Sequence, residues 1–125
     1  MIATFQSKLY LPDGIHNGNC FAACLASVME IPLWMVPPFE DMFARDDWRI
    51  RSNEWALRMF GGRFVRTNGH ESENMPEFYI ANGLSARKVY HSVIYSDGVL
   101  VHDPHPSHAG IENVEWTYHF AKEAA

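Results

Sequence analysis

One stretch decides the fold, residues 18–29, which read GNCFAACLASVM. The apolar side chains of one helix face recur there at three- and four-residue spacing: Phe21, Cys24, Leu25 and Val28. Asn17 or Asn19 can cap such a helix at its start, and Pro32 stops it. We therefore expect a helix over residues 20–30, with small residues on its other faces that allow close packing.

The first residue of this helix is a cysteine, Cys20. A thiol in the first turn lies at the positive end of the helix dipole, which favours the nucleophilic thiolate. A free cysteine is also a common small core residue, and Cys24, one turn further into the helix, fits that use. Two cysteines on successive turns of one helix are awkward to bridge, so we expect both to be reduced.

A hairpin in the C-terminal half carries two residues that can serve such a thiol. The sequence SDG at 96–98 is a tight-turn signal between two apolar runs. This turn brings His91, which opens the first strand, near Asp103, which follows the second. A histidine can act as base toward Cys20, and an aspartate can orient that histidine. In the alternative interpretation, His91 is a half-buried strand residue and Asp103 an ordinary turn residue.

Helix signals precede strand signals along the chain. Further helices are expected over 39–45 and 47–60, the second ended by Gly61 and Gly62. The expected strands are 1–5, 63–67, 78–81, 89–95, 99–102 and 113–118. This order predicts the α+β class, with N-terminal helices packed on a C-terminal antiparallel β-sheet. The length of 125 residues fits a single domain over residues 1–125 with one core.

Gln6 is a candidate donor to a reacting carbonyl oxygen. Its side-chain amide could join the backbone N–H of Cys20 in an oxyanion hole. Thirteen residues lie between the two, and most glutamines are simply solvated.

The stretch HDPHPSH at 102–108 offers a different chemistry. Three histidines and an aspartate could bind a transition metal through His102, His105 and His108. The prolines exclude a regular helix, and no fourth ligand follows at a recognisable spacing. We therefore expect a polar loop beside an active site, with no metal and no cofactor.

The charge and composition of the chain argue against some classes of binding partner. The net charge is −5 with His neutral, which argues against a general phosphate-backbone binder. The sequence has no like-charge run, no signal-peptide pattern and no apolar run approaching about 18 residues. We expect a cytoplasmic protein that binds neither nucleic acid nor membrane.

Two motifs carry a family resemblance. Residues 18–27 resemble a stretch of small, uncharacterised phage and bacterial members of the papain-like cysteine peptidase superfamily, and so do the Ile31-Pro32-Leu33 and Val36-Pro37 that follow. Residues 91–94 and 101–107 resemble them too. The order Gln, Cys, His, Asp is similar to that of bacteriocin-processing peptidase domains of ABC exporters.

The resemblance implies a papain-like fold with Cys20 as nucleophile, His91 as base and Asp103 as orienting residue. It places Gln6 at the oxyanion position. The expected function is a cysteine hydrolase that cleaves an amide, peptide or isopeptide bond through an acyl-enzyme, with a peptide or protein as substrate. An acyl transferase would use the same residues.

Two further functions stay open at this point. One is a non-catalytic binding module on a papain-like fold, possibly phage-encoded. The other is a metal-binding protein that uses the histidines of 102–108. The sequence sets neither the substrate nor the oligomeric state.

Overall fold

The computed structural model describes residues 1–11, 18–44, 47–69 and 75–123. These residues form, in chain order, α1 (Cys20–Met29), a short 3₁₀ helix η1 (Leu33–Met35), α2 (Phe39–Met42), α3 (Trp48–Phe60), β1 (Gly62–Asn68), β2 (Tyr79–Leu84), β3 (Tyr90–Ser96), β4 (Val99–His102) and β5 (Trp116–Lys122). The predicted α+β class, with helices first and an antiparallel sheet second, is confirmed.

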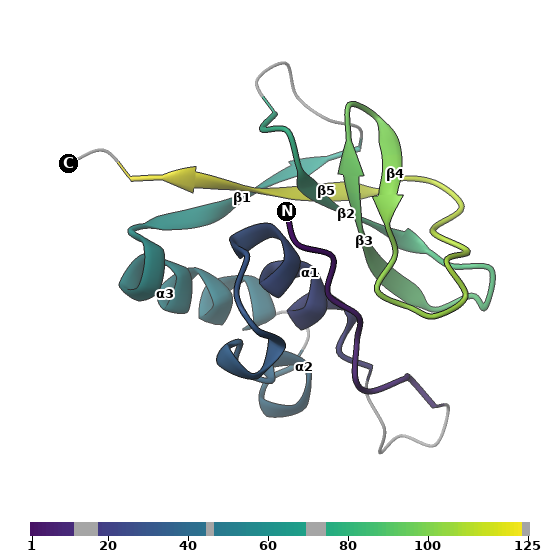
Figure 1. The fold of residues 1–125 in the computed structure, drawn as a ribbon, viewed down its shortest axis with the longest axis horizontal. Coiled ribbons are helices and arrows are strands. Elements are labelled where there is room, and N and C mark those ends of the chain that lie inside the picture. The colour runs from purple at the N-terminus through teal and green to yellow at the C-terminus, as the bar shows by residue number, and fades with distance from the viewer. Residues whose placement is uncertain (12–17, 45–46, 70–74, 124–125) are drawn as a thin grey trace.

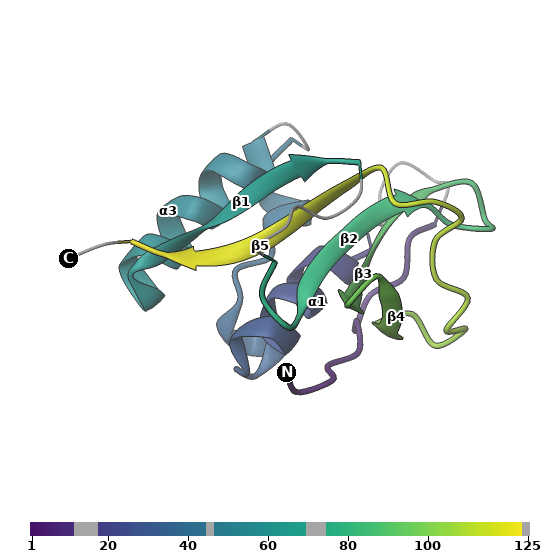
Figure 2. The same ribbon diagram turned by 90° about the horizontal axis from the view of Figure 1, so that it is seen from above.

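The five strands form one antiparallel sheet in the order β1-β5-β2-β3-β4. The helices gather on one side of this sheet, with α3 beside β1 and α1 beside β2 and β3 (Figure 1). Seen from above, the sheet twists across the helical layer, and the N-terminal segment runs beside α1 toward the β3–β4 end (Figure 2). The first residues of α1 therefore lie close to the edge of the sheet at β3.

The core lies between α1, α3 and the sheet. Phe21, Cys24 and Leu25 of α1 are buried there against Ile80 of β2 and Ile94 of β3. Val28 completes the predicted helix face and is partly buried against the same cluster. Cys24 is thus a small core residue, as expected for the second cysteine.

The predicted side-chain cap of α1 does not form at Asn19. The helix begins at Cys20 and Asn19 occupies the cap position, but its side chain makes no capping hydrogen bond. Its Oδ1 instead accepts from the backbone N–H groups of Ser7 and Lys8, at 3.0 and 2.9 Å. Asn17, the other candidate cap, lies outside the described residues.

The two predicted turns hold in the structure. Gly61 follows α3 in the left-handed conformation, with φ of 71°. Asp97 and Gly98 join β3 to β4 with φ of 51° and 74°. Positive φ at both central residues is the signature of a type I′ hairpin, whose twist matches the flanking strands.

Three predicted boundaries need correction. The N-terminal strand over 1–5 is absent, because Ile2 and Thr4 bond with Ser27 of α1 and with the side chain of His102 rather than with the backbone of a strand. The helix over 39–45 ends at Met42, and residue 45 lies outside the described residues. The last strand starts later than 113, at Trp116, where pairing with both β1 and β2 begins.

Among the described residues, no single helix is long and apolar enough to cross a membrane. Cys20–Met29 and Leu33–Met42 reach that length and hydropathy only as a pair, with a bend of 104° between them.

Candidate active site

His91 and Asp103 form the central contact of the site. Nε2 of His91 lies 2.6 Å from Oδ1 of Asp103, and both side chains are buried. The β3–β4 ladder ends at the pair Ile94 and His102, so the chain leaves the sheet at Asp103 beside the start of β3. The hairpin thus brings the two residues together as the sequence predicted.

Cys20 completes the group from the helical side. Its thiol lies close enough to His91 for the interaction between the two side chains to raise the pKa of the His91 ring. Because the Asp103 carboxylate only accepts hydrogen bonds, Nε2 of His91 carries a proton toward it, which leaves Nδ1 for the thiol. The structure therefore brings Cys20, His91 and Asp103 together, each from a different part of the chain.

The imidazole ring of His91 is held in its charged form. Burial lowers the pKa of His91, but the hydrogen bonds with Asp103 and Cys20 outweigh burial and raise it to about 9. At neutral pH the ring is therefore an imidazolium.

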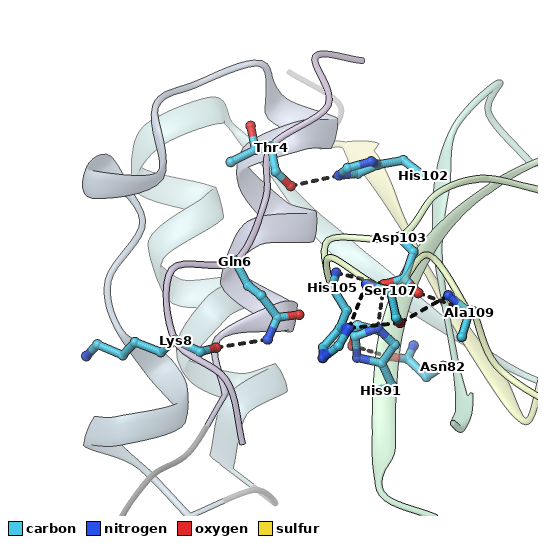
Figure 3. A network of polar contacts seen from close by, with 12 residues as sticks. Thr4, Gln6, Lys8, Asn82, His91, His102, Asp103, His105, Ser107 and Ala109 are labelled. Atoms are coloured by element: carbon cyan, nitrogen blue, oxygen red, sulfur yellow. Dashed lines mark hydrogen bonds and ion pairs between the residues drawn. The ribbon is translucent and has the colours of Figure 1, made fainter. Parts of the chain in front are cut away.

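Asp103 is satisfied on both carboxylate oxygens. Oδ1 also accepts from the backbone N–H of His105 at 2.8 Å (Figure 3). Oδ2 accepts from the backbone N–H of Gly110 at 2.7 Å. Burial raises the pKa of Asp103, but these bonds and the one from His91 outweigh it and hold the pKa below its usual value. Asp103 is thus a fixed anion that orients the His91 ring.

The N-terminal segment carries Gln6 into the site. The backbone N–H of Gln6 bonds to the carbonyl of Pro104 at 3.1 Å, and Asn19 ties the next two residues to the start of α1. A Cβ at Gly18 would lie 3.4 Å from Nε2 of Gln6, which places the amide next to the residues just before Cys20. In Figure 3, Gln6 lies across from the ring of His91.

The amide of Gln6 already makes one hydrogen bond. Nε2 donates to the carbonyl of Lys8 at 2.8 Å, which uses one of its two N–H groups. The other N–H is the one that an oxyanion could use. Gln6 therefore lines the cleft with one N–H left over, and its role as an oxyanion donor stays a prediction.

Glu40 is a site residue that the sequence did not single out. It is buried, and its Oε1 accepts from the backbone N–H of Ala22 in the first turn of α1, at 2.8 Å. Burial raises the pKa of Glu40 to about 7. Glu40 follows Phe39 in the sequence, and nothing in the residues around it indicates a contact with the start of α1.

The histidine stretch does not form a metal cluster. His102 Nε2 bonds to the carbonyl of Thr4 at 2.7 Å, His105 Nδ1 to Ser107 Oγ at 2.8 Å, and His108 packs edge-on against Phe5. Within the described ranges, no three His, Cys, Asp or Glu side chains are placed to hold a metal ion together. The stretch instead forms the loop that carries Asp103.

A cleft of about 1030 Å³ opens onto Cys20, His91 and Gln6. The floor of the cleft is the same face of the sheet that packs against the helices further along the strands. Residues two apart on a strand lie on the same face, so each strand can contribute one residue to the core and another to the cleft. Buried Phe64 on β1 is followed by Arg66 in the cleft, and buried Ile80 on β2 by Asn82. The other strands take the same step, from Tyr118 to Trp116 and from Ile94 to Ser92.

The comparisons with known proteins leave the site to be judged on its geometry. The chain matches no family model, no curated protein and no solved structure.

Proposed function

We propose that this protein is a cysteine hydrolase of papain-like architecture that cleaves an amide, peptide or isopeptide bond. The observation that carries the proposal is the position of His91, in contact with both Cys20 and Asp103 at the edge of the cleft. A thiol at a helix start, on the opposite side of the cleft from a strand histidine, supports the papain-like assignment. Because the chemistry needs a reduced Cys20, we also propose a reducing, cytoplasmic setting.

Acylation is the first half of the reaction. The Cys20 thiolate attacks the carbonyl carbon, so that a C–S bond forms and the carbonyl oxygen becomes an anion. The His91 imidazolium then gives its Nδ1 proton to the leaving nitrogen as the C–N bond breaks. The amine departs and the acyl group stays on sulfur as a thioester.

Deacylation returns the enzyme to its starting state. Neutral His91 takes a proton from water while the water oxygen attacks the thioester carbon. The C–S bond breaks, the carboxylic acid leaves, and the thiolate–imidazolium pair is restored. An amine in place of water would make the same protein an acyl transferase.

The oxyanion needs donors on the Cys20 side of the cleft. The backbone N–H of Cys20 lies in the first turn of α1, where N–H groups have no partner within the helix. The free N–H of Gln6 is the proposed second donor. Losing one such donor typically costs about 100–1000-fold in rate.

The proposal is tested with a mixture of synthetic peptides whose products are read by mass spectrometry. We expect cleavage products from the wild-type protein and from Cys24→Ala, and none from Cys20→Ala. After an acid quench, the acyl group should be found on Cys20. Cleavage by Cys20→Ala at the wild-type rate would contradict the proposal, and so would the absence of both products and acyl adduct.

A further inference from the structure

The charges that line the cleft are opposite in sign to the charge of the chain. The chain carries −5 overall. The described residues that line the cleft include four cations, Arg49, Arg66, Arg87 and Lys88, and a single acid, Glu40. Cations concentrated in a cleft raise the local concentration of anionic ligands.

The single acid does little to neutralise these cations. Glu40 is buried with its Oε1 on the N–H of Ala22, so this oxygen is committed to the start of α1. Its pKa, raised by burial to about 7, leaves a large share of the carboxyl groups uncharged at neutral pH. The charge of His91 is balanced by the Asp103 carboxylate 2.6 Å away, so the arginine and lysine side chains set the sign of the charge in the cleft.

Two of the four cations are already engaged. Lys88 pairs with Glu112 at 2.6 Å. Arg66 donates from Nε to Asn68 at 3.1 Å, and its guanidinium lies 5.0 Å from the ring centre of Trp116. These two side chains are held in place by the protein itself.

Arg49 and Arg87 differ from them. Both are exposed, and neither forms an ion pair with any acid in the part of the chain that the structure describes. Arg49 lies in the first turns of α3, on the helical side of the cleft, and Arg87 lies between β2 and β3, on the sheet side. A guanidinium without a partner offers a forked set of donors that matches a carboxylate.

We infer that the cleft binds an acidic peptide segment, with Arg49 and Arg87 pairing its carboxylates from opposite sides. The inference rests on the proposed function, because a thiol nucleophile needs a carbonyl carbon and a peptide supplies one beside its carboxylates. A nucleic acid would match the cations but offers no such amide bond in its backbone. The aromatic side chains of Trp48 and Trp116 in the same cleft provide apolar contact for the peptide stem.

The first test uses two small alkylating agents that differ in charge. Iodoacetate is an anion and iodoacetamide is neutral, and both report on Cys20. In the double variant Arg49→Gln/Arg87→Gln, we expect the iodoacetate rate to fall at least about fivefold while the iodoacetamide rate stays within about twofold. Arg58→Gln is the matched control, since Arg58 is an exposed arginine of α3 that does not line the cleft. An unchanged iodoacetate rate in the double variant would overturn the inference.

The second test uses two peptides that share one cleavable bond but carry either Glu or Gln at the flanking positions. We expect the Glu peptide to have a kcat/KM at least about tenfold higher, mainly through KM, and to lose this advantage in the double variant. Equal cleavage of both peptides would overturn the inference and leave the proposed function standing. If neither peptide is cleaved and Cys20 reacts no faster than Cys24, the proposed function fails instead.

A competition experiment separates the acidic peptide from a nucleic acid. Each is added at equal charge, and the protection of Cys20 from iodoacetamide is measured. Stronger protection by the Glu peptide supports the inference. Stronger protection by a single-stranded oligonucleotide would overturn it.

Discussion

Nε2 of His91 and Oδ1 of Asp103 lie 2.6 Å apart, although the two residues are twelve positions apart in the chain. The type I′ turn at Asp97 and Gly98 folds β4 back onto β3 and brings the two residues to one end of the hairpin. The same carboxylate also holds the loop after β4, through the N–H groups of His105 and Gly110. A single side chain thus orients the imidazole and shapes the loop beside it.

Replacing Asp103 should lower the rate of hydrolysis without abolishing it. In Asp103→Asn, we expect amide hydrolysis to fall by about 100- to 10,000-fold, because the ring of His91 loses the anion that orients it. Alkylation of Cys20 at neutral pH should slow less than it does in His91→Ala. Asp97→Asn is the control, since it makes the same substitution at the turn of the same hairpin, where asparagine tolerates a positive φ. Equal activity of the two variants would contradict the role of Asp103.

The charge on His91 should make the protein less stable in alkali. The pKa of His91 is raised from 6.5 to about 9, so its contribution to stability is complete below pH 6.5 and is lost as the pH rises through 9. Urea unfolding at several pH values between these limits measures the free energy of unfolding. The difference between wild type and His91→Gln should shrink as the pH rises, and a difference that grows would contradict the assignment.

Glu40 should lower stability at neutral and alkaline pH. Its pKa is raised from 4.5 to about 7, so the folded state favours the protonated form and stability is lost as the pH rises through this window. A shift of this size corresponds to about 3 kcal/mol, and Glu40→Gln should recover part of it above pH 7. Glutamine still offers an oxygen to the N–H of Ala22. Asp41→Asn, an exposed change in the same helix, should have a much smaller effect, and equal effects of the two variants would count against the assignment.

Cys24 should prove dispensable for chemistry. It is fully buried in the core, and burial raises the pKa of its thiol well above the usual value, so it should resist alkylation. Cys24→Ala should leave peptide cleavage unchanged while costing about 1 kcal/mol of stability through the lost sulfur contacts. Thermal unfolding and the cleavage assay measure the two effects, and a loss of cleavage in a folded variant would contradict this division of roles.

Local sequence was enough to predict the elements that carry the site. The start of α1 at Cys20 and the turn at Asp97 and Gly98 both depend on neighbouring residues, through helix periodicity and turn chemistry. The meeting of His91 with Asp103 follows from that turn. The proximity of Cys20 to His91 was predicted only from the types and order of the residues. It results from the packing of α1 on β3, which no local pattern specifies.

The features that sequence did not predict depend on distant partners. The N-terminal residues look like a strand, but Thr4 bonds to Ser27 and His102 instead. Asn19 gives its side chain to Ser7 and Lys8 rather than to its own helix. No local pattern indicates which of two available sets of hydrogen bonds a segment will form.

The late start of β5 has a similar cause. Trp116 is the first residue that can pair with Asn68 on one side and Asn82 on the other, so the strand begins where both neighbours are present. Residues 113–115, which read NVE, gave no sign of that limit.

The central claim is that Cys20 is a nucleophile activated by His91, and alkylation at neutral pH tests it most directly. The wild-type protein and His91→Ala are each partly labelled with iodoacetamide, and peptide mapping by mass spectrometry gives the rate at each cysteine. The account predicts that Cys20 reacts far faster than Cys24 in the wild type and slows markedly in His91→Ala. Equal labelling of the two cysteines, or a Cys20 rate that does not depend on His91, would contradict it.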